Sequence, residues 1–313
     1  MPALVRILWL TRRCDGRSPD AGRRPGGQRA RIPGRATRAN THSRSPAIHR
    51  YWLKQRAVKA AYDRLAVAPG GAALRAAIDF VRRTRTARGC NLTLPHKIDV
   101  LPLLDSIDER AERIGAVNTV VKQPDGSLRG SNTDAFGFIE HLHQSAPGWH
   151  AEQAPVAVIG AGGAARAVIA ALLEAGVREL RMTNRTRATA IALGTAMAPL
   201  DGRQLQVVPW AERADMLDGA GLLVNTTSLG MVGHDTLDLP LDRLPRSAVV
   251  DDIVYVPLET DLLSRARARG NLCVDGFGML LHQARPQFQA WFGGPLPEVT
   301  AAMRHEVGAD LGA

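Results

Sequence analysis

Apolar and polar residues follow two periods in the second half of the chain. Short apolar runs bounded by glycine or polar residues predict buried strands, and stretches with an apolar residue every three or four positions predict helices. Strands and helices alternate in the order Val156–Ile159, Ala164–Ala175, Glu179–Thr183, Thr186–Met197, Gln206–Val208, Gly221–Asn225, Ala248–Asp252, Thr260–Arg269 and Asn271–Asp275. This order predicts a parallel α/β sheet covered by helices on both faces.

The first half becomes regular only at Pro46. Its pattern predicts helices and strands in turn: a helix at Pro46–Val58, a strand at Tyr62–Val67, a helix at Gly71–Arg83, a strand at Cys90–Leu94 and a helix at Asp134–Gln144. Asp125-Gly126, between Asn118–Lys122 and Ser127–Asn132, predicts a hairpin. Ala146-Pro147-Gly148 indicates a break between domains, and helices are expected at Gly278–Phe292 and Val299–Leu311.

The charge of the chain is concentrated in its first 40 residues. Of the net +10, that segment carries +8 from ten Arg and two Asp, which leaves +2 for the other 273 residues. A basic, nucleic-acid-binding surface needs its charge on the folded body, so we expect no nucleic-acid partner. Every apolar run is too short to span a bilayer, so we expect no membrane association.

Residues 11–40 are rich in Arg, Gly and Pro and show no apolar period. We expect them to be disordered or poorly packed. We place residues 1–40 as a tail outside the working core, either aberrant or resembling an organelle-targeting peptide. The alternative is that Leu4–Leu10, the one strand-like run before residue 40, pairs as a strand of the first domain, with Thr11–Asn40 as a long loop.

A glycine-rich turn joins the apolar strand Val156–Ile159 to the helix that follows. The turn and the start of that helix read Gly160, Ala161, Gly162, Gly163, Ala164 and Ala165. Gly160 permits a tight turn, Gly162 lets backbone N–H groups approach a pyrophosphate, and Ala165 lets the helix pack close to the strand. The helix N-terminus then faces the phosphates, so the pattern predicts a dinucleotide site.

The end of the next strand indicates which dinucleotide. An NAD site usually has Asp or Glu there, but this chain has Asn184, Arg185, Thr186 and Arg187. A carboxylate would repel a 2′-phosphate, whereas guanidinium groups and a hydroxyl can bind it. We therefore predict NADP, with Arg185 as the stronger candidate and Arg187 equally consistent with a solvated helix charge.

Three polar clusters precede the cofactor domain, at 42–46, at 91–97, and at 115–119 with 132–134. They offer hydroxyls, amides, an ammonium group and a carboxylate, which suits a polyhydroxylated, negatively charged substrate. Ser43 and Ser45 precede a helix with Pro46 in its first turn, so helix capping is an alternative role for them. Lys97 and Asp134 could be an ordinary ion pair or two unrelated charges.

A series of motifs makes the chain resemble the shikimate dehydrogenases over roughly residues 41–295. In order, they are Asn-Leu-Thr-Leu-Pro-His-Lys, Gly-Ala-Val-Asn-Thr, Asn-Thr-Asp, Gly-Ala-Gly-Gly-Ala, Asn-Arg-Thr, Asn-Thr-Thr-Ser-Leu-Gly-Met, Asp-Ile-Val-Tyr-Val-Pro and Asp-Gly-Phe-Gly-Met-Leu-Leu-His-Gln-Ala. The chain departs from the family before His42, where 34–41 lack the usual first strand and turn.

The resemblance implies reversible reduction of 3-dehydroshikimate to shikimate by NADPH, without a metal. It implies that Lys97 and Asp134 form the catalytic pair. The implied substrate contacts are Ser43 and Ser45 at the carboxylate, Thr93, Asn118 and Gln283 at ring hydroxyls, and Asp134 and Tyr255 nearby. Met231 and Gly276 would lie near the nicotinamide. A Lys placed at the reacting oxygen can stabilise its charge and deliver a proton.

We thus expect two α/β domains, an N-terminal substrate-binding domain and a Rossmann-type NADP-binding domain with a parallel sheet. The expected bounds are 41–133, completed by 276–313, for the substrate domain and 134–275 for the cofactor domain. We expect a soluble cytoplasmic enzyme, with a homodimer left open. A quinate/shikimate dehydrogenase using NAD or NADP, or an inactive ligand-binding homologue with a damaged N-terminus, are the alternatives.

Overall fold

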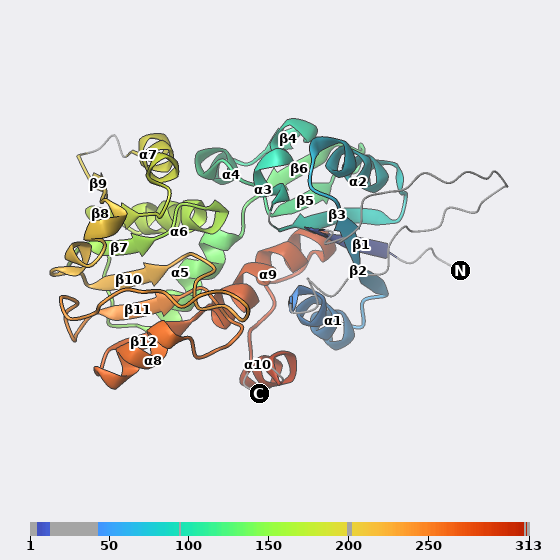
Figure 1. The fold of residues 1–313 in the computed structure, drawn as a ribbon. Coiled ribbons are helices and arrows are strands. Elements are labelled where there is room, and N and C mark those ends of the chain that lie inside the picture. Colours follow the sequence, from blue (N-terminus) through green and yellow to red (C-terminus); the bar gives the residue numbers. More distant parts are fainter. Residues whose placement is uncertain (1–4, 13–42, 94, 199–201, 310, 312–313) are drawn as a thin grey trace. The chain divides into compact units, whose positions relative to one another are not determined.

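The structure is a computed structural model that describes residues 5–12, 43–93, 95–198, 202–309 and 311 (Figure 1). The chain divides into two compact units. The first comprises Met1–Ile107 and Val117–Gly130, and the second comprises Asp108–Ala116 and Ser131–Ala313. Each unit is built around a six-stranded sheet with helices against it, which confirms the expected two-domain α/β class.

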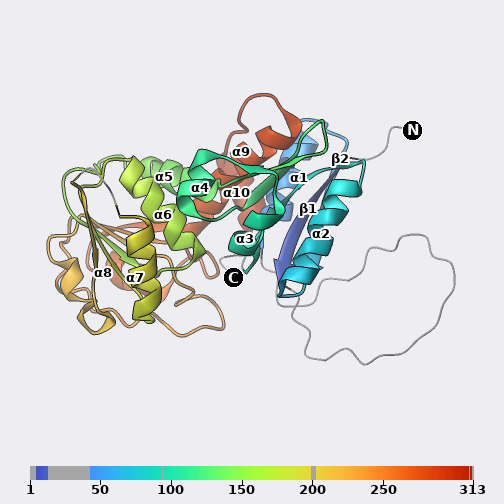
Figure 2. The same cartoon turned by 90° about the horizontal axis from the view of Figure 1, so that it is seen from above.

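The sheet of the first unit has the order β2-β1-β3-β5-β6-β4. The strands are β2 Ala60–Val67, β1 Val5–Arg12, β3 Ala87–Leu92, β5 Thr119–Lys122, β6 Leu128–Ser131 and β4 Ser106–Ile107. The helices are α1 Ser45–Gln55, α2 Gly71–Arg83 and the short α3 His96–Asp99, and α1 and α2 lie on opposite faces of the sheet (Figures 1 and 2). The strands β5 and β6 lie side by side around Asp125-Gly126, as the turn predicted.

The strand β1 corrects the expectation that residues 1–40 form a tail. Val5–Arg12 pairs in parallel with β2 on one side and with β3 on the other, so it is an inner strand. Ile7, Leu8 and Leu10 are buried. Because two ladders of backbone hydrogen bonds and three apolar side chains favour this placement, the alternative kept for Leu4–Leu10 describes the segment better. The prediction that residues 11–40 are disordered concerns, from residue 13 onward, a segment outside the described residues.

The sheet of the second unit has the order β12-β11-β10-β7-β8-β9, and all five pairs of neighbouring strands in it are parallel. The strands are β7 Val156–Ile159, β8 Glu179–Thr183, β9 Gln204–Val207, β10 Leu222–Asn225, β11 Val249–Asp252 and β12 Leu272–Asp275. The chain order reverses between β7 and β10, which makes this a Rossmann sheet with its switch point at β7. Ligands of such sheets bind outside the carboxyl ends of the strands beside that point.

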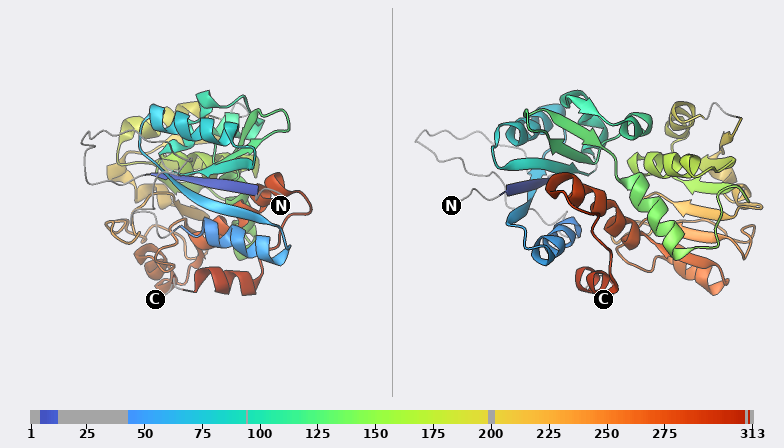
Figure 3. Two further views of the ribbon diagram at one scale, coloured as in Figure 1. Left: turned by 90° about the vertical axis from the view of Figure 1, so that its right-hand side faces the viewer. Right: turned by 180° about the vertical axis from the view of Figure 1, so that it is seen from behind.

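The helices of the second unit are α4 Glu109–Ile114, α5 Asp134–Ser145, α6 Gly163–Glu174, α7 Arg187–Ala196, α8 Asp261–Ala268, α9 Gly276–Phe292 and α10 Ala301–Gly308. The helices α5 and α9 pack side by side (Figure 3, right). The buried cluster beside them includes Phe138, Leu142 and Val168. The helices α9 and α10 belong to the same compact unit as the Rossmann sheet. We expected residues 276–313 to complete the substrate domain, and their part in binding substrate stays a prediction.

No helix among the described residues is long and apolar enough to cross a membrane. Nor do the described residues contain a group of three or more His, Cys, Asp or Glu that could hold a metal ion.

Candidate active site

The glycine-rich turn lies at the switch point of the second sheet. Gly160 has φ +114°, which favours glycine, and its N–H donates to the Thr183 carbonyl at 2.8 Å. A Cβ on Gly160 would overlap the hydroxyl of Thr226, whereas one on Gly162 would meet nothing within 4 Å. Gly160 is therefore required by the fold, while Gly162 leaves open space where a ligand can approach the backbone.

The helix α6 begins directly after this turn. Gly162 is its N-cap residue, and no side chain of the described residues caps its first turn. The first N–H groups of a 12-residue helix are thus available at the end of an apolar strand, which fits a pyrophosphate. Ala161 and Ala165 are buried, as close packing of helix on strand requires.

The residues that we predict at the 2′-phosphate follow β8. Arg185, Thr186 and Arg187 are exposed, and Thr186 is the N-cap residue of α7. The amide of Asn184 donates to the Thr186 carbonyl at 3.0 Å and so shapes this turn. No acidic residue occurs in the turn, so the side chains present fit an anionic group and their phosphate contact stays a prediction.

A buried network joins the carboxyl ends of β10 and β11. The Asn225 amide donates to the Asp252 carboxylate at 2.9 Å, and its oxygen accepts from the Thr227 hydroxyl at 2.8 Å. Asp252 also accepts from the Thr260 hydroxyl at 2.7 Å. Burial raises the pKa of Asp252 to about 6, and these hydrogen bonds oppose the rise. The network positions the loops that carry Met231 and Tyr255.

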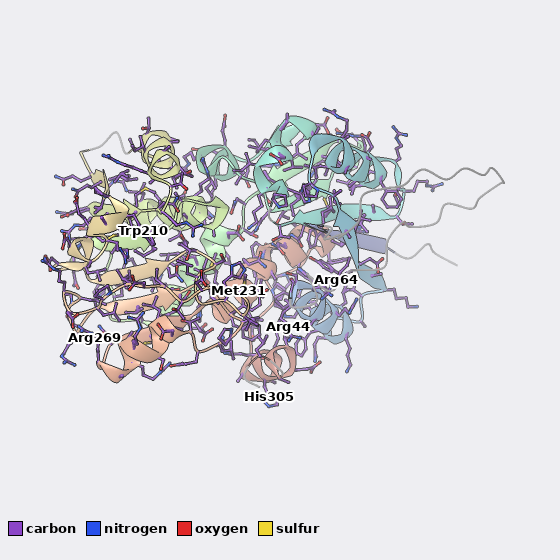
Figure 4. All side chains as sticks on the ribbon, viewed as in Figure 1. Arg44, Arg64, Trp210, Met231, Arg269 and His305 are labelled. Atoms are coloured by element: carbon purple, nitrogen blue, oxygen red, sulfur yellow. The ribbon has the colours of Figure 1, made fainter. Side chains whose placement is uncertain are left out.

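Asn225 and Asp252 were not among the predicted site residues, although both belong to motifs that resemble the family. Met231 is 36% exposed on the loop after β10 (Figure 4), and Tyr255 is half-buried. Gly276 opens α9, and a Cβ there would overlap the carbonyl of Ile253. Met231, Tyr255 and Gly276 all follow carboxyl ends of strands in the second unit, and their contacts with ligand stay predictions.

Two predicted substrate motifs meet in the first unit. The Asn91 amide donates to the Asn118 carbonyl at 3.0 Å and to the Thr119 hydroxyl at 3.2 Å. The Tyr62 hydroxyl donates to the Asn91 oxygen at 2.6 Å. Burial raises the pKa of Tyr62 well above its usual value, so the phenol stays a donor. The structure thus places Asn118 beside the strand that leads to Thr93.

Lys97 is half-buried on α3, directly after Thr93 and the turn that follows it. Its carbonyl accepts the Val117 N–H at 2.8 Å, and the Thr93 carbonyl accepts the His96 N–H at 2.9 Å. These backbone bonds tie the motif that contains Lys97 to the motif that contains Asn118. Lys97, Thr93 and Asn118 therefore belong to one unit and lie on connected segments.

Ser43 and Ser45 stand at the start of α1. The Ser43 hydroxyl accepts the Ser45 N–H at 3.4 Å, and the Arg64 guanidinium donates to the Ser43 carbonyl at 2.9 Å. Figure 4 labels Arg64 and the neighbouring Arg44. The N-cap residue of α1 is Arg44, which makes no side-chain capping hydrogen bond. The capping role and the substrate contact of Ser43 and Ser45 therefore both stay predictions. His42 lies outside the described residues.

Asp134 and Gln283 belong to the second unit. Asp134 is buried at the start of α5, where its N–H donates to the Asn132 oxygen at 3.0 Å. Gln283 lies on α9 and contacts Thr133, the residue before Asp134, with 3.4 Å between the hydroxyl and the amide oxygen. Lys97 belongs to the first unit and Asp134 to the second, and their pairing stays a prediction.

Comparisons with known proteins identify the family of the chain. A model of the shikimate dehydrogenase substrate binding domain matches residues 38–120, and a model of shikimate / quinate 5-dehydrogenase matches residues 141–230. The shikimate dehydrogenase (NADP(+)) of Paramagnetospirillum magneticum is 53% identical over 88% of this chain and 97% of its own length. That of Rhodospirillum rubrum is 53% identical over 85% of this chain and 93% of its own length.

Solved structures show the same fold. A quinate dehydrogenase from Corynebacterium glutamicum in complex with NAD aligns with a TM-score of 0.81 at 30% identity, over 98% of this chain and 99% of that one. Shikimate 5-dehydrogenase from Thermus thermophilus, in complex with NADP(H) and shikimate, aligns with a TM-score of 0.77 at 34% identity, over the same two shares. The chain therefore belongs to the shikimate dehydrogenase family.

Proposed function

We propose that this chain catalyses the reversible, NADP-dependent reduction of 3-dehydroshikimate to shikimate, a step in the biosynthesis of aromatic amino acids. The observation that carries the proposal is the 53% identity to an NADP-dependent shikimate dehydrogenase across nearly all of that relative's length. The exposed Arg185 in the turn after β8 supports the choice of NADP.

When bound, the nicotinamide cofactor supplies or accepts a hydride at the ring carbon that bears the oxygen. Gly160, Ala161, Gly162, Gly163 and Ala164 would hold its pyrophosphate at the start of α6. The 2′-phosphate would contact the turn after β8, through Asn184, Arg185, Thr186 and Arg187. Met231 and Gly276 would line the nicotinamide end.

The chain's own residues supply the proton and the orientation. The Lys97 ammonium would donate a proton to the oxygen as the carbonyl is reduced and take it back in the reverse direction. Asp134 would hold that ammonium. Ser43 and Ser45 would bind the substrate carboxylate, while Thr93, Asn118, Gln283 and Tyr255 would contact the ring and its hydroxyls.

The alternative is a broader quinate/shikimate dehydrogenase, favoured by the similarity to the quinate dehydrogenase bound to NAD. The test is a four-way assay of the purified full-length chain, with shikimate or quinate and NADP or NAD. We expect the highest kcat/KM with shikimate and NADP. A higher value with quinate and NAD would favour the alternative, and no turnover with any pair would favour an inactive homologue. We also propose a cytoplasmic location and leave the homodimer as a hypothesis for size measurement.

A further inference from the structure

Three buried side chains form a closed triangle between the start of α5 and the middle of α9. The Gln287 amide nitrogen donates to the Thr133 hydroxyl at 2.8 Å and also donates to the Gln283 amide oxygen. The Thr133 hydroxyl in turn donates to that same oxygen at 3.4 Å. Thr133 and Gln283 are each 6% exposed and Gln287 is 2% exposed, so water does not compete for these groups.

The polarity of this triangle is set by a backbone group. The Gln283 Nε2 donates to the Leu280 carbonyl at 3.1 Å. A carbonyl oxygen can only accept, so the end of the Gln283 amide that faces Leu280 must be its nitrogen. The Gln283 oxygen therefore points to Thr133 and Gln287, both of which can donate to it. A reversed amide would set donor against donor at one end and acceptor against acceptor at the other.

We infer that Gln287 is a positioning residue: together with Thr133 it holds the Gln283 oxygen inward, so that Gln283 offers its amide nitrogen to the substrate. The group recognised is then an oxygen that accepts a hydrogen bond, such as a ring hydroxyl or carbonyl. Gln287 acts only through Gln283. This inference rests on the proposed function, in which Gln283 contacts the substrate.

The test reverses the donor at position 287. In Gln287→Glu the ionised carboxylate has the same shape as the amide but can only accept hydrogen bonds. It therefore places a second acceptor against the Gln283 oxygen, where the parent has a donor. The KM for shikimate should rise roughly 10- to 100-fold, the range expected for one mispaired buried group. The kcat and the KM for NADP should change by less than about threefold, because neither the proton donor nor the cofactor turn is touched.

A pH profile separates positioning from simple damage. When protonated, the introduced carboxyl has an O–H that can donate to the Gln283 oxygen, and burial raises its pKa. The KM for shikimate of Gln287→Glu should therefore fall towards the parent value as pH is lowered from about 8.5 to about 5.5. Gln287→Met keeps the bulk but has no titrating group, so the ratio of its KM to that of the parent should not depend on pH.

Other ionisable groups on the two helices are common to parent and variants: Asp134, Glu140, His141, His143, His282 and Arg285. Glu140 and Arg285 pair at 3.0 Å. Their titration cancels in the ratio of KM values. If Gln287→Glu does not fold, Thr133→Val and Thr133→Ser give a second test, since only the serine keeps the hydroxyl. The valine variant should raise the shikimate KM severalfold and the serine variant should not.

An unchanged shikimate KM in Gln287→Glu across the pH range overturns the inference. So does an increase that is independent of pH and equal to that of Gln287→Met, which would indicate a structural role alone. Failure of the proposed function looks different, because the parent itself would then neither bind nor oxidise shikimate. If the parent is active but Gln283→Ala leaves the shikimate KM unchanged, Gln283 does not contact substrate and the inference falls with that contact.

Discussion

Leu10 offers a direct test of whether β1 is part of the sheet. The side chain is 0% exposed, and the residue stands opposite Leu65 on β2 and Leu92 on β3. Leu10→Ala removes buried methyl groups between two ladders, where little can collapse into the space. The free energy of unfolding should fall by about 2–5 kcal/mol, a large part of a total of roughly 5–15 kcal/mol.

Deleting residues 1–12 should have a larger effect. Ile7, Leu8 and Leu10 are 0%, 4% and 0% exposed. At about 1.5–3 kcal/mol for each buried side chain, their loss comes to roughly 5–9 kcal/mol before any hydrogen bonds are counted. The first unit should then fail to fold, and the product should be insoluble or quickly digested by trypsin within 43–107.

The assay is urea unfolding of the full-length parent, of Leu10→Ala and of a control, Phe80→Ala. Phe80 lies on α2 of the same unit and is 40% exposed, so its loss should cost about 1 kcal/mol or less. If Leu10→Ala costs no more than the control and the chain without residues 1–12 melts like the parent, β1 is not an inner strand. The segment would then be the tail that its composition suggested.

Three further predictions concern charge. Arg185→Ala should raise the KM for NADP with a loss of roughly 1.5–3 kcal/mol in binding and leave the KM for NAD nearly unchanged; equal effects on both would argue against a 2′-phosphate contact. Lys97→Met should lower kcat by about two to four orders of magnitude, while the affinity for NADP, measured by fluorescence titration, should not change. A fall in kcat of only a few-fold would mean that another residue donates the proton. Burial and the neighbouring Asp252 raise the pKa of Asp251 well above its usual value. The protonated carboxyl therefore stabilises the folded state at low pH. This contribution is lost as the pH rises from about 4, where the unfolded chain ionises, through the folded pKa. Asp251→Asn should therefore unfold at a higher urea concentration than the parent at neutral pH, and this gain in stability should shrink towards pH 4. A gain in stability that does not depend on pH would show that charge is not its cause.

The second unit was predictable because its signals are local. Val156–Ile159 is a run of four buried residues followed by Gly160, and both the strand and the turn were found where the pattern placed them. The helix predicted at Ala164–Ala175 is α6, Gly163–Glu174. A parallel strand covered on both faces is apolar throughout, so its own residues identify it. The same holds for the turn, since only glycine readily adopts the φ of Gly160.

Two other features of the fold are not visible in the local sequence pattern. Cys90 on β3 is buried, whereas Cys273 on β12 is half-buried. The edge position of β12 accounts for the difference, because a strand pattern does not say which strand closes the sheet. The short helix α3, which carries Lys97, has four residues, too few for a helical period to appear.

The residue types at the site, the glycine turn and the absence of an acidic residue after β8 could all be read from the chain, because each depends on neighbours within a few positions. The place of Val5–Arg12 could not, since its ladders join it to residues about 55 and 80 positions away, across the Arg-rich stretch that follows it. Nor could the Thr133–Gln283–Gln287 triangle, in which Thr133 is 150 and 154 positions from the two glutamines. Whether a glutamine binds substrate or positions another glutamine depends on which polar atoms it meets when buried, and only the packing of α5 against α9 determines that.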